Sequence, residues 1–322
     1  MSEIALLAVQ NLYTHFRVPR GLVRAVDGVS FSLRPGETLG LVGESGCGKS
    51  TLGKSIARLI QPTAGKLLFD GVDIFPLSRR QLKPFRKRIQ FVFQDPYASL
   101  NPRSSVQRIL EEPLFIHGVT LKEERLRLIT ALLERVGIPT DSLKNYPHEF
   151  SGGQRQRIGI ARALTLNPEL IICDEPVSAL DVSVQAQVLN LLADLQKELR
   201  FASLFITHDF SVVKYIADRI AVMYLGTIVE IAEPDTLWNA PLHPYTQALV
   251  NAVPVSDPTA ATRKKTLLGG EIPSQISPPP GCRFHPRCPE AMDICSTQMP
   301  PLLPYSKNED NASFVACHLH TS

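Results

Sequence analysis

The sequence has no hydrophobic run long enough to cross a membrane, and it does not begin like a secreted protein. It has 322 residues, 44% of them hydrophobic, yet no apolar stretch approaches the roughly 18 residues that a spanning helix needs. The opening MSEIALLAVQNLY lacks the basic head and long apolar run of a secretory signal. We therefore expect a cytosolic chain that is attached to a membrane only through a partner.

The chain also lacks a strong excess of one charge, and it contains no internal repeat. Its formal net charge is +3, which is no polybasic signature and gives no argument for a nucleic-acid partner. The length suggests one large domain, or one domain plus an appendage, with enough hydrophobic residues for a packed core.

Cysteine is scarce and unevenly distributed. Of 6 cysteines, Cys47 and Cys173 lie inside motifs described below. The other four crowd the C-terminal end: Cys282, Cys288, Cys295 and Cys317. A reducing compartment disfavours disulfides, so such a group indicates a metal site. The spacing C-x5-C-x6-C-x21-C differs from the closely paired cysteines of structural zinc sites and equally suits an iron–sulfur cluster. His285 and His318 are neighbours that could ligate or simply pack.

A phosphate-binding loop is the clearest motif. The run GESGCGKST fits the pattern G-x-x-x-x-G-K-S/T and lies between an apolar strand pattern and a helix pattern. Glycines let successive N–H groups face phosphates, and the helix start adds positive potential. Lys49 is expected to bind the β- and γ-phosphates, and the Ser50 hydroxyl to ligate Mg²⁺. We predict that the whole run binds ATP: Gly43, Glu44, Ser45, Gly46, Cys47, Gly48, Lys49, Ser50 and Thr51.

Polar residues follow three further strand-like runs. Asp174 and Glu175 end LIICDE, where Asp174 suits a Mg²⁺ shell and Glu175 suits a base that deprotonates the attacking water. Gln94 follows FVF and His208 follows LFIT. By themselves these two could be ordinary polar residues after a strand.

The run FSGGQRQR begins another helix pattern. Ser151, Gly152 and Gly153 present a hydroxyl and bare N–H groups at a helix start. This is an anion site with neither a lysine nor metal ligands of its own.

Strand and helix patterns alternate to about residue 250, which predicts a largely parallel sheet covered by helices and therefore an α/β fold. Residues 80–150 are predicted to be mostly helical. Prolines then cluster, so we interpret residues 253–281 as a linker. Residues 282–322 form a loop-rich module too small to bury a core of its own.

Taken together, the motifs resemble the ATP-binding-cassette (ABC) ATPases over residues 1 to about 250. The resemblance implies a RecA-like P-loop core, an antiparallel β subdomain and a helical subdomain at about 95–165, all within residues 1–252. It implies that Gln94 contacts Mg²⁺ and water and that His208 contacts the γ-phosphate. Phe16 matches the aromatic residue that stacks on adenine, with Tyr13 as a near alternative.

The resemblance also implies that two cassettes sandwich each nucleotide. The residues that would bind ATP held by the other subunit are Ser151, Gly152, Gly153 and Gln154, together with Asp181 of SALD.

HPYTQAL, the stretch LGGEIPSQISPPPGCRFHPRCPEAMDIC and VACH resemble the C-terminal extension of dipeptide, oligopeptide and nickel importer ATPases. The match is closest to the second ATPase of a dipeptide importer. It implies a [4Fe-4S] cluster on the four late cysteines, with Zn²⁺ or free thiols as the alternatives. The implied partners are a companion ABC ATPase in a heterodimer, two permeases and an extracytoplasmic binding protein, at the cytoplasmic face of the inner membrane. Alternatives are a nickel importer ATPase and a soluble ABC ATPase that acts on nucleic acid or ribosomes.

Overall fold

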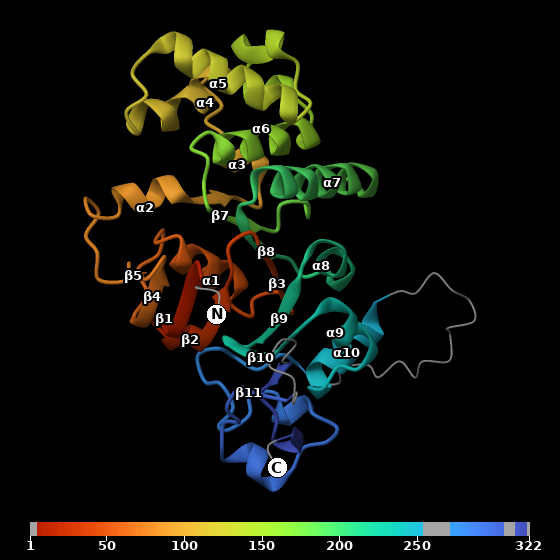
Figure 1. Ribbon diagram of the computed structural model, residues 1–322. Helices are drawn as coiled ribbons and strands as arrows, with labels where there is room; N and C mark the ends of the chain where they lie inside the picture. Colours follow the sequence, from red (N-terminus) through yellow and green to blue (C-terminus); the bar gives the residue numbers. More distant parts are fainter. Residues whose placement is uncertain (1–4, 254–270, 306–312, 321–322) are drawn as a thin grey trace. The chain divides into compact units, whose positions relative to one another are not determined.

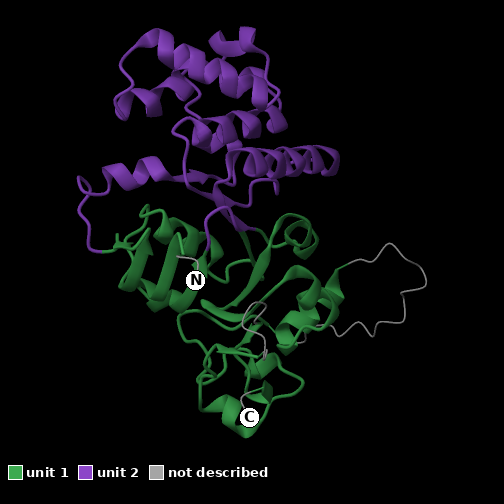
Figure 2. Cartoon of the chain, viewed as in Figure 1, with its two compact units in different colours: residues 1–33, 38–75, 207–322 green, residues 34–37, 76–206 purple. Residues whose placement is uncertain are grey.

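The computed structural model describes residues 5–253, 271–305 and 313–320, and Figure 1 labels its helices and strands. The chain divides into two compact units, coloured separately in Figure 2. Unit 1 comprises residues 1–33, 38–75 and 207–322, and unit 2 comprises residues 34–37 and 76–206. Most of the predicted proline-rich linker, at 254–270, lies outside the described residues.

Unit 1 contains an antiparallel sheet with the strand order β2-β1-β4-β5. Its strands are β1 (Leu7–Val18), β2 (Gly21–Leu33), β4 (Ala64–Phe69) and β5 (Val72–Asp73). Leu7, Val9 and Leu12 of β1 are buried. The first two strands, β1 and β2, therefore form one antiparallel hairpin.

A second set of strands in unit 1 has the order β11-β12-β10-β9-β3. The strands are β3 (Thr38–Val42), β9 (Arg219–Tyr224), β10 (Thr227–Ala232), β11 (Leu303–Pro304) and β12 (Phe314–Val315). The β3–β9 pair is parallel and the other pairs are antiparallel. The α-helices of this unit are α1 (Lys49–Ile56), α8 (Phe210–Ile216), α9 (Pro234–Asn239) and α10 (Pro244–Ala252).

The C-terminal residues pack onto the rest of unit 1. Their described elements are short: η4 (His285–Arg287), η5 (Asp293–Ser296), η7 (His318–His320) and the strands β11 and β12. Phe284 is 1% exposed, and its ring lies 5.3 Å from that of Tyr224 and 5.4 Å from that of Tyr245. The loop-rich region thus buries its apolar side chains against β9 and α10.

Unit 2 contains three parallel strands in the order β8-β7-β6, with helices around them. The strands are β6 (Ile89–Val92), β7 (Leu170–Asp174) and β8 (Ala202–Ile206). The helices are α2 (Lys83–Arg88), α3 (Pro96–Ser99), α4 (Val106–Ile116), α5 (Lys122–Arg135), α6 (Gly152–Leu164) and α7 (Val182–Leu199), with η1 (Thr140–Lys144) and η2 (Pro147–Glu149). The predicted helical character of 80–150 is confirmed.

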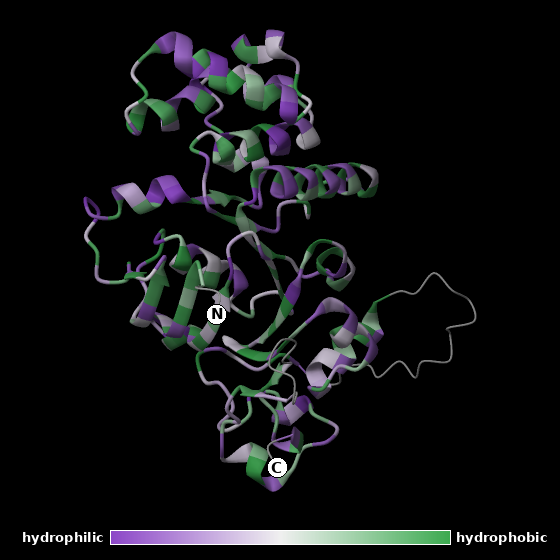
Figure 3. Cartoon of the chain, in the orientation of Figure 1, coloured by the Kyte–Doolittle hydropathy of each residue, from purple (hydrophilic) through white to green (hydrophobic). Residues whose placement is uncertain are grey.

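Hydropathy follows these elements. Every residue of β7 and β8 is buried, as expected for parallel strands covered on both faces. Helices α5 and α7 alternate hydrophilic and hydrophobic residues along their length (Figure 3), as helices with one buried face do. Within the described residues, no helix combines the length and the apolar character that a membrane span requires.

Candidate active site

The P-loop of unit 1 connects β3 to α1, and its glycines are required by close packing. Gly48 has φ 110°, and a Cβ added there would lie 1.9 Å from the carbonyl oxygen of Ala25. A Cβ added at Gly43 would lie 2.1 Å from the carbonyl oxygen of Met223. Larger residues at either position would displace the backbone of β2 or β9.

Lys49 is the first residue of α1, and its ammonium lies inside the loop. Its Nζ donates to the carbonyl oxygens of Gly43 at 2.8 Å and Glu44 at 3.0 Å. The residue is 4% exposed. The Cys47 thiol lies 3.9 Å from Nζ, and burial raises the pKa of this thiol. A single buried cation therefore lies among the backbone groups of the loop.

The structure brings His208 to the P-loop. His208 follows β8 and precedes α8, and it lines a cavity of about 290 Å³ together with Gly43. Asp209 caps α8, because its side chain accepts from the N–H of Ser211 at 2.8 Å. This cap orders the turn that carries His208.

Phe16 and Tyr13 have different surroundings on β1. Phe16 is 38% exposed, so its ring is accessible to a planar ligand. The Tyr13 ring packs against β2 at Gly28 and lies 5.8 Å from the His15 ring. Exposure favours Phe16 for stacking on adenine.

In unit 2, two predicted catalytic residues are in contact. Gln94 Nε2 donates to the Glu175 carboxylate at 3.0 Å. Glu175 comes directly after β7 with φ 47°, and its N–H donates to the carbonyl oxygen of Ile206 at 2.9 Å. A non-glycine residue in the left-handed region is held there by its surroundings, as is frequent at active sites. Asp174, at the end of β7, is 2% exposed.

The run FSGGQRQR of unit 2, from here on the signature run, begins α6 with a capping box. Ser151 Oγ accepts from the N–H of Gln154 at 3.3 Å, and Gln154 Oε1 accepts from the N–H of Ser151 at 2.9 Å. A Cβ added at Gly153 would lie 2.4 Å from Cγ1 of Val184, so close packing against α7 requires this glycine. Asp181, exposed, is the N-cap residue of α7.

The four late cysteines lie in unit 1 and carry free thiols. Burial, with a smaller contribution from the neighbouring thiols, raises the pKa of Cys282 to about 11. The described residues contain no group of three or more His, Cys, Asp or Glu side chains placed to hold a metal ion. The structure therefore does not support the predicted [4Fe-4S] cluster or its zinc alternative. His285 Nδ1 lies 2.8 Å from the carbonyl oxygen of Cys282, and His318 Nε2 lies 2.9 Å from that of Gln298.

Sequence reasoning missed the residues that support the P-loop from outside the motif. The Tyr245 hydroxyl accepts from the N–H of Glu44 at 2.9 Å. Gln275 Nε2 donates to the carbonyl oxygen of Gly46 at 2.6 Å, and Arg287 binds the Glu44 carboxylate. The runs HPYTQAL and FHPRCP contain two of these residues, but nothing in their spacing pointed to the P-loop.

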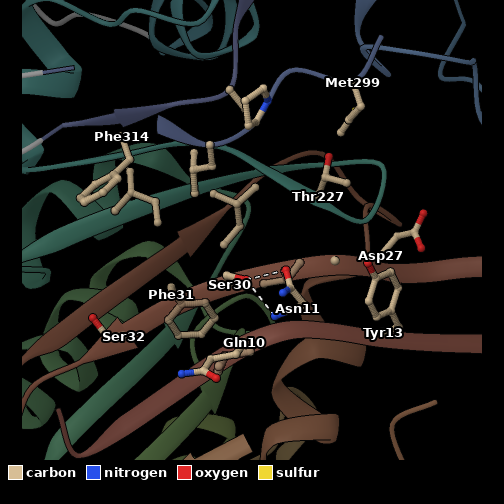
Figure 4. A pocket seen from close by; sticks show the side chains of 18 of the residues that line it. Gln10, Asn11, Tyr13, Asp27, Ser30, Phe31, Ser32, Thr227, Met299 and Phe314 are labelled. Atoms are coloured by element: carbon tan, nitrogen blue, oxygen red, sulfur yellow. Dashed lines mark hydrogen bonds between the residues drawn. The ribbon is translucent and has the colours of Figure 1, made fainter. Parts of the chain in front are cut away.

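A second cavity in unit 1 is larger than the one at His208. It has a volume of about 680 Å³ and is walled by β1, β2, β10 and C-terminal residues, including Phe31, Thr227, Met299 and Phe314 (Figure 4). Asn11 and Ser30 are hydrogen-bonded to each other in its wall. Of the residues considered for binding ATP, Mg²⁺ or iron–sulfur, only Tyr13, the alternative to Phe16 for adenine stacking, lines this cavity.

Known proteins resemble both parts of the chain. The family model for ABC transporters matches residues 26–178, and the model for the oligopeptide/dipeptide transporter C-terminal region matches residues 229–295. The oligopeptide transport ATP-binding protein AppF of Bacillus subtilis (strain 168) is 53% identical over 99% of this chain and 99% of its own length. The chain belongs to the ATP-binding proteins of peptide ABC transporters. A second protein of that organism, YkfD, is 54% identical over 99% of this chain and 97% of its own length.

Solved structures agree with this membership. The dimeric ATP-binding cassette MJ0796, bound to ADP and Pi, matches with a TM-score of 0.65 and 29% identity over 71% of this chain and 98% of its own. The cassette cbiO1 of Clostridium perfringens, part of the cbiONQ transporter complex, has a TM-score of 0.64 and 29% identity over 73% of this chain and 91% of its own. The predicted ABC ATPase fold and ATPase activity are confirmed. Membership implies ATP with Mg²⁺ and membrane permeases as partners of this peptide-transporter ATPase.

Proposed function

We propose that this chain is the ATP-hydrolysing motor of an importer for dipeptides or oligopeptides. The observation that carries the proposal is the pairing of an ABC ATPase cassette with a peptide-transporter C-terminal region in one chain. AppF, similar over nearly its whole length, is by name an oligopeptide transport ATP-binding protein. This favours peptides over the nickel alternative, and transport over a soluble ATPase acting on nucleic acid or ribosomes.

Hydrolysis is assigned to the end of β7. Glu175 takes a proton from water, whose oxygen then bonds to the γ-phosphorus while the bond to the β–γ bridging oxygen breaks, releasing ADP and phosphate. Gln94 orients this carboxylate through its 3.0 Å hydrogen bond. Ser50, Gln94 and Asp174 would hold Mg²⁺, which when bound would neutralise the negative charge of the phosphates. His208 contacts the γ-phosphate.

Binding is assigned to the P-loop and Phe16. Lys49 exchanges its hydrogen bonds with the loop carbonyls for contacts with the β- and γ-phosphates. Phe16 stacks on adenine. The N–H groups of residues 43–51 complete the phosphate site.

The signature residues act on the nucleotide of a companion ATPase in a heterodimer. The start of α6 presents the exposed Ser151 without a lysine in its motif. MJ0796, similar over most of the cassette, is dimeric. Ser151, Gly152, Gly153 and Gln154 then bind the γ-phosphate across the interface, with Asp181 beside them.

The permeases dock on unit 2. A cavity of about 340 Å³ lies among α4, the end of α6 and the residues after Gln94, with Ser99, Ile116 and Arg162 in its walls. Phe115 and Ile116 are 63% and 52% exposed, which is unusual for adjacent large apolar residues unless a partner covers them. Docking there places the chain at the cytoplasmic face of the inner membrane.

The [4Fe-4S] cluster, with Zn²⁺ as the alternative, stays a prediction, and the hydrolysis described above does not involve it. Its support is that the Cys282 N–H donates to the carbonyl oxygen of Cys295 at 2.8 Å, and that the thiols of Cys288, Cys295 and Cys317 contribute to the raised pKa of Cys282. Protein purified without oxygen should contain iron and sulfide that Cys288→Ser removes. Stoichiometric zinc would favour the alternative, and metal-free protein would reject both.

Transport of labelled peptides tests the function. The complex of this chain with its companion, permeases and binding protein, reconstituted in vesicles, should take up a labelled dipeptide or oligopeptide when ATP is supplied. Glu175→Gln should abolish uptake, whereas Glu169→Gln, the same change at the exposed residue just before β7, should not. Uptake of nickel but not of peptide would refute the proposal. Recovery of the chain away from membranes, even with permeases present, would favour a soluble ATPase.

A further inference from the structure

The C-terminal region reaches the P-loop of its own chain through a two-pronged ion pair. Arg287, the last residue of η4, donates from Nη1 to Glu44 Oε2 at 2.8 Å and from Nη2 to Glu44 Oε1 at 3.0 Å. The Arg287 side chain is 5% exposed and that of Glu44 is 20% exposed. Such bidentate, largely buried pairs are stronger and more specific in geometry than single surface contacts.

Glu44 is the second residue of the P-loop, and its backbone is also held on both sides. Its N–H donates to the Tyr245 hydroxyl at 2.9 Å, and its carbonyl oxygen accepts from Lys49 Nζ at 3.0 Å. Arg287 Nη1 also lies 3.3 Å from the Tyr224 hydroxyl. The guanidinium thus orders the residue whose carbonyl accepts from the phosphate-binding lysine.

The negative charge of Glu44 links its contact with Arg287 to nucleotide binding. A carboxylate inside a phosphate-binding loop repels the anionic ligand, and a partly buried charge is poorly screened by salt. A guanidinium hydrogen-bonded to both oxygens neutralises it at any physiological pH. Hydrogen bonding to Glu44 raises the pKa of Arg287.

We propose that Arg287 is a positioning residue for nucleotide binding: by neutralising and orienting Glu44, it makes the P-loop of its own chain receptive to a nucleoside triphosphate. The inference rests on the proposed function in that the P-loop binds ATP. It extends the nucleotide site into the C-terminal region.

The test compares Arg287→Met with Glu44→Gln and with the double variant, in the full chain. Arg287→Met leaves the Glu44 carboxylate unpaired, so the Kd for a fluorescent ATP analogue and the KM for ATP should rise about tenfold with kcat unchanged. In the double variant the repelling charge is gone, so the Kd should return to within about twofold of the wild-type value.

Two matched arginines control for structure. Arg80 is exposed, and Arg80→Met should leave the Kd unchanged. Arg283 is buried in the same C-terminal region but binds Asp27 and the carbonyl oxygen of Leu225. Any defect of Arg283→Met should not be relieved by Glu44→Gln, because Arg283 does not contact that carboxylate.

Three outcomes would overturn the inference: an unchanged Kd in Arg287→Met, a defect that Glu44→Gln fails to relieve, or a tenfold loss in Glu44→Gln alone. The last variant keeps Arg287 and its packing, so it remains informative if Arg287→Met does not fold. Failure of the wild-type chain to bind nucleotide would instead refute the proposed function.

Discussion

Two glycine-containing helix starts, those of α1 and α6, differ in how their backbone groups are satisfied. The N-cap of α1 is Gly48, which offers no side-chain hydrogen bond, and Lys49 follows directly. The N-cap of α6 is Ser151, which forms a reciprocal capping box with Gln154. The first start is thus left for a ligand, whereas the second is satisfied by its own side chains.

This difference leads us to expect two anion sites of unequal strength in one chain. The start of α1 offers backbone N–H groups together with a buried cation, so it can hold triphosphate alone. At the start of α6 a phosphate has to compete with the Ser151–Gln154 cap and finds no lysine in the motif. We therefore expect α6 to contribute only when a nucleotide is already held by another P-loop.

The largest effect should come from a change that spares both helix starts. Glu175→Gln removes the base at the end of β7, and kcat for ATP should fall about 10²–10⁴-fold with the nucleotide Kd unchanged. Steady-state hydrolysis and fluorescent nucleotide binding measure the two quantities. Glu169→Gln is the matched control, because Glu169 is an exposed glutamate just before β7 that pairs with Arg88 and has no assigned role in hydrolysis. Near-normal turnover in Glu175→Gln would show that Glu175 is not the general base.

The next largest effect should separate the two helix starts directly. Lys49→Ala deletes the cation of the α1 start, and the nucleotide Kd should rise on the order of 100-fold, as loss of a charge-assisted hydrogen bond predicts. Lys66→Ala, at an exposed position of β4, should leave the Kd unchanged. Equal affinity in Lys49→Ala and wild type would show that α1 holds the nucleotide without its cation.

The sequence predicted both helix starts, and it did so for a physical reason. Each motif combines glycines, a capping or cationic residue and a following helix pattern within a few residues, so its shape is local. The strand β7 and its terminal acids were equally readable, because a continuous apolar run ends in Asp174 and Glu175.

Contacts between distant segments could not be predicted in the same way. Glu44 lies 243 positions from Arg287 and 201 from Tyr245, and no periodicity links them. The surface on which the small C-terminal module buries its apolar residues was also beyond local patterns, because Phe284 finds its apolar partners on β9 and α10. The spacing of the late cysteines likewise identified them as a group, but it could not predict whether the folded chain places them to hold a metal ion.

A smaller effect should reveal the cap at α6. Ser151→Ala should lower the free energy of unfolding by about 1 kcal/mol, measured by urea denaturation. Ser105, whose hydroxyl accepts from the N–H of Arg108 at the start of α4, is the control. Ser105→Ala should cost a similar amount of stability but retain ATP hydrolysis, whereas Ser151→Ala should lose both. Equal hydrolysis in the two variants would reduce Ser151 to a structural cap.

The smallest effect concerns a third helix start, α10, whose Tyr245 holds the P-loop. His243 caps it through Nδ1, which accepts from the N–H of Tyr245 at 3.0 Å. Burial lowers the pKa of His243 to about 3, so the unfolded chain binds this proton more readily and stability falls as pH drops from about 6.5 toward 3. The Glu230 carboxylate, which accepts from the His243 N–H, has a pKa raised by burial. The contribution of Glu230 to stability is lost as pH rises above the pKa that it has in the unfolded chain. This pH dependence is opposite in direction to that of His243.

Because Glu230 and the nearby His320 are present in both proteins, the difference between wild type and His243→Asn isolates the histidine. Between pH 7 and pH 5, the urea midpoint of unfolding should fall more for wild type than for His243→Asn. Parallel pH dependence would contradict a buried neutral histidine at this helix start.

The central claim, that the α1 and α6 starts of one chain serve different nucleotides, is tested most directly by a photoreactive ATP analogue in the complex with the companion ATPase. One complex combines Ser151→Arg in this chain with loss of the P-loop lysine in the companion. The other carries Lys49→Ala and Ser151→Arg together in this chain. The account predicts that the first complex still occludes and labels nucleotide at this chain's P-loop, because both changes fall on one composite site, and that the second occludes none. Occlusion by the companion in the second complex, with none in the first, would contradict it.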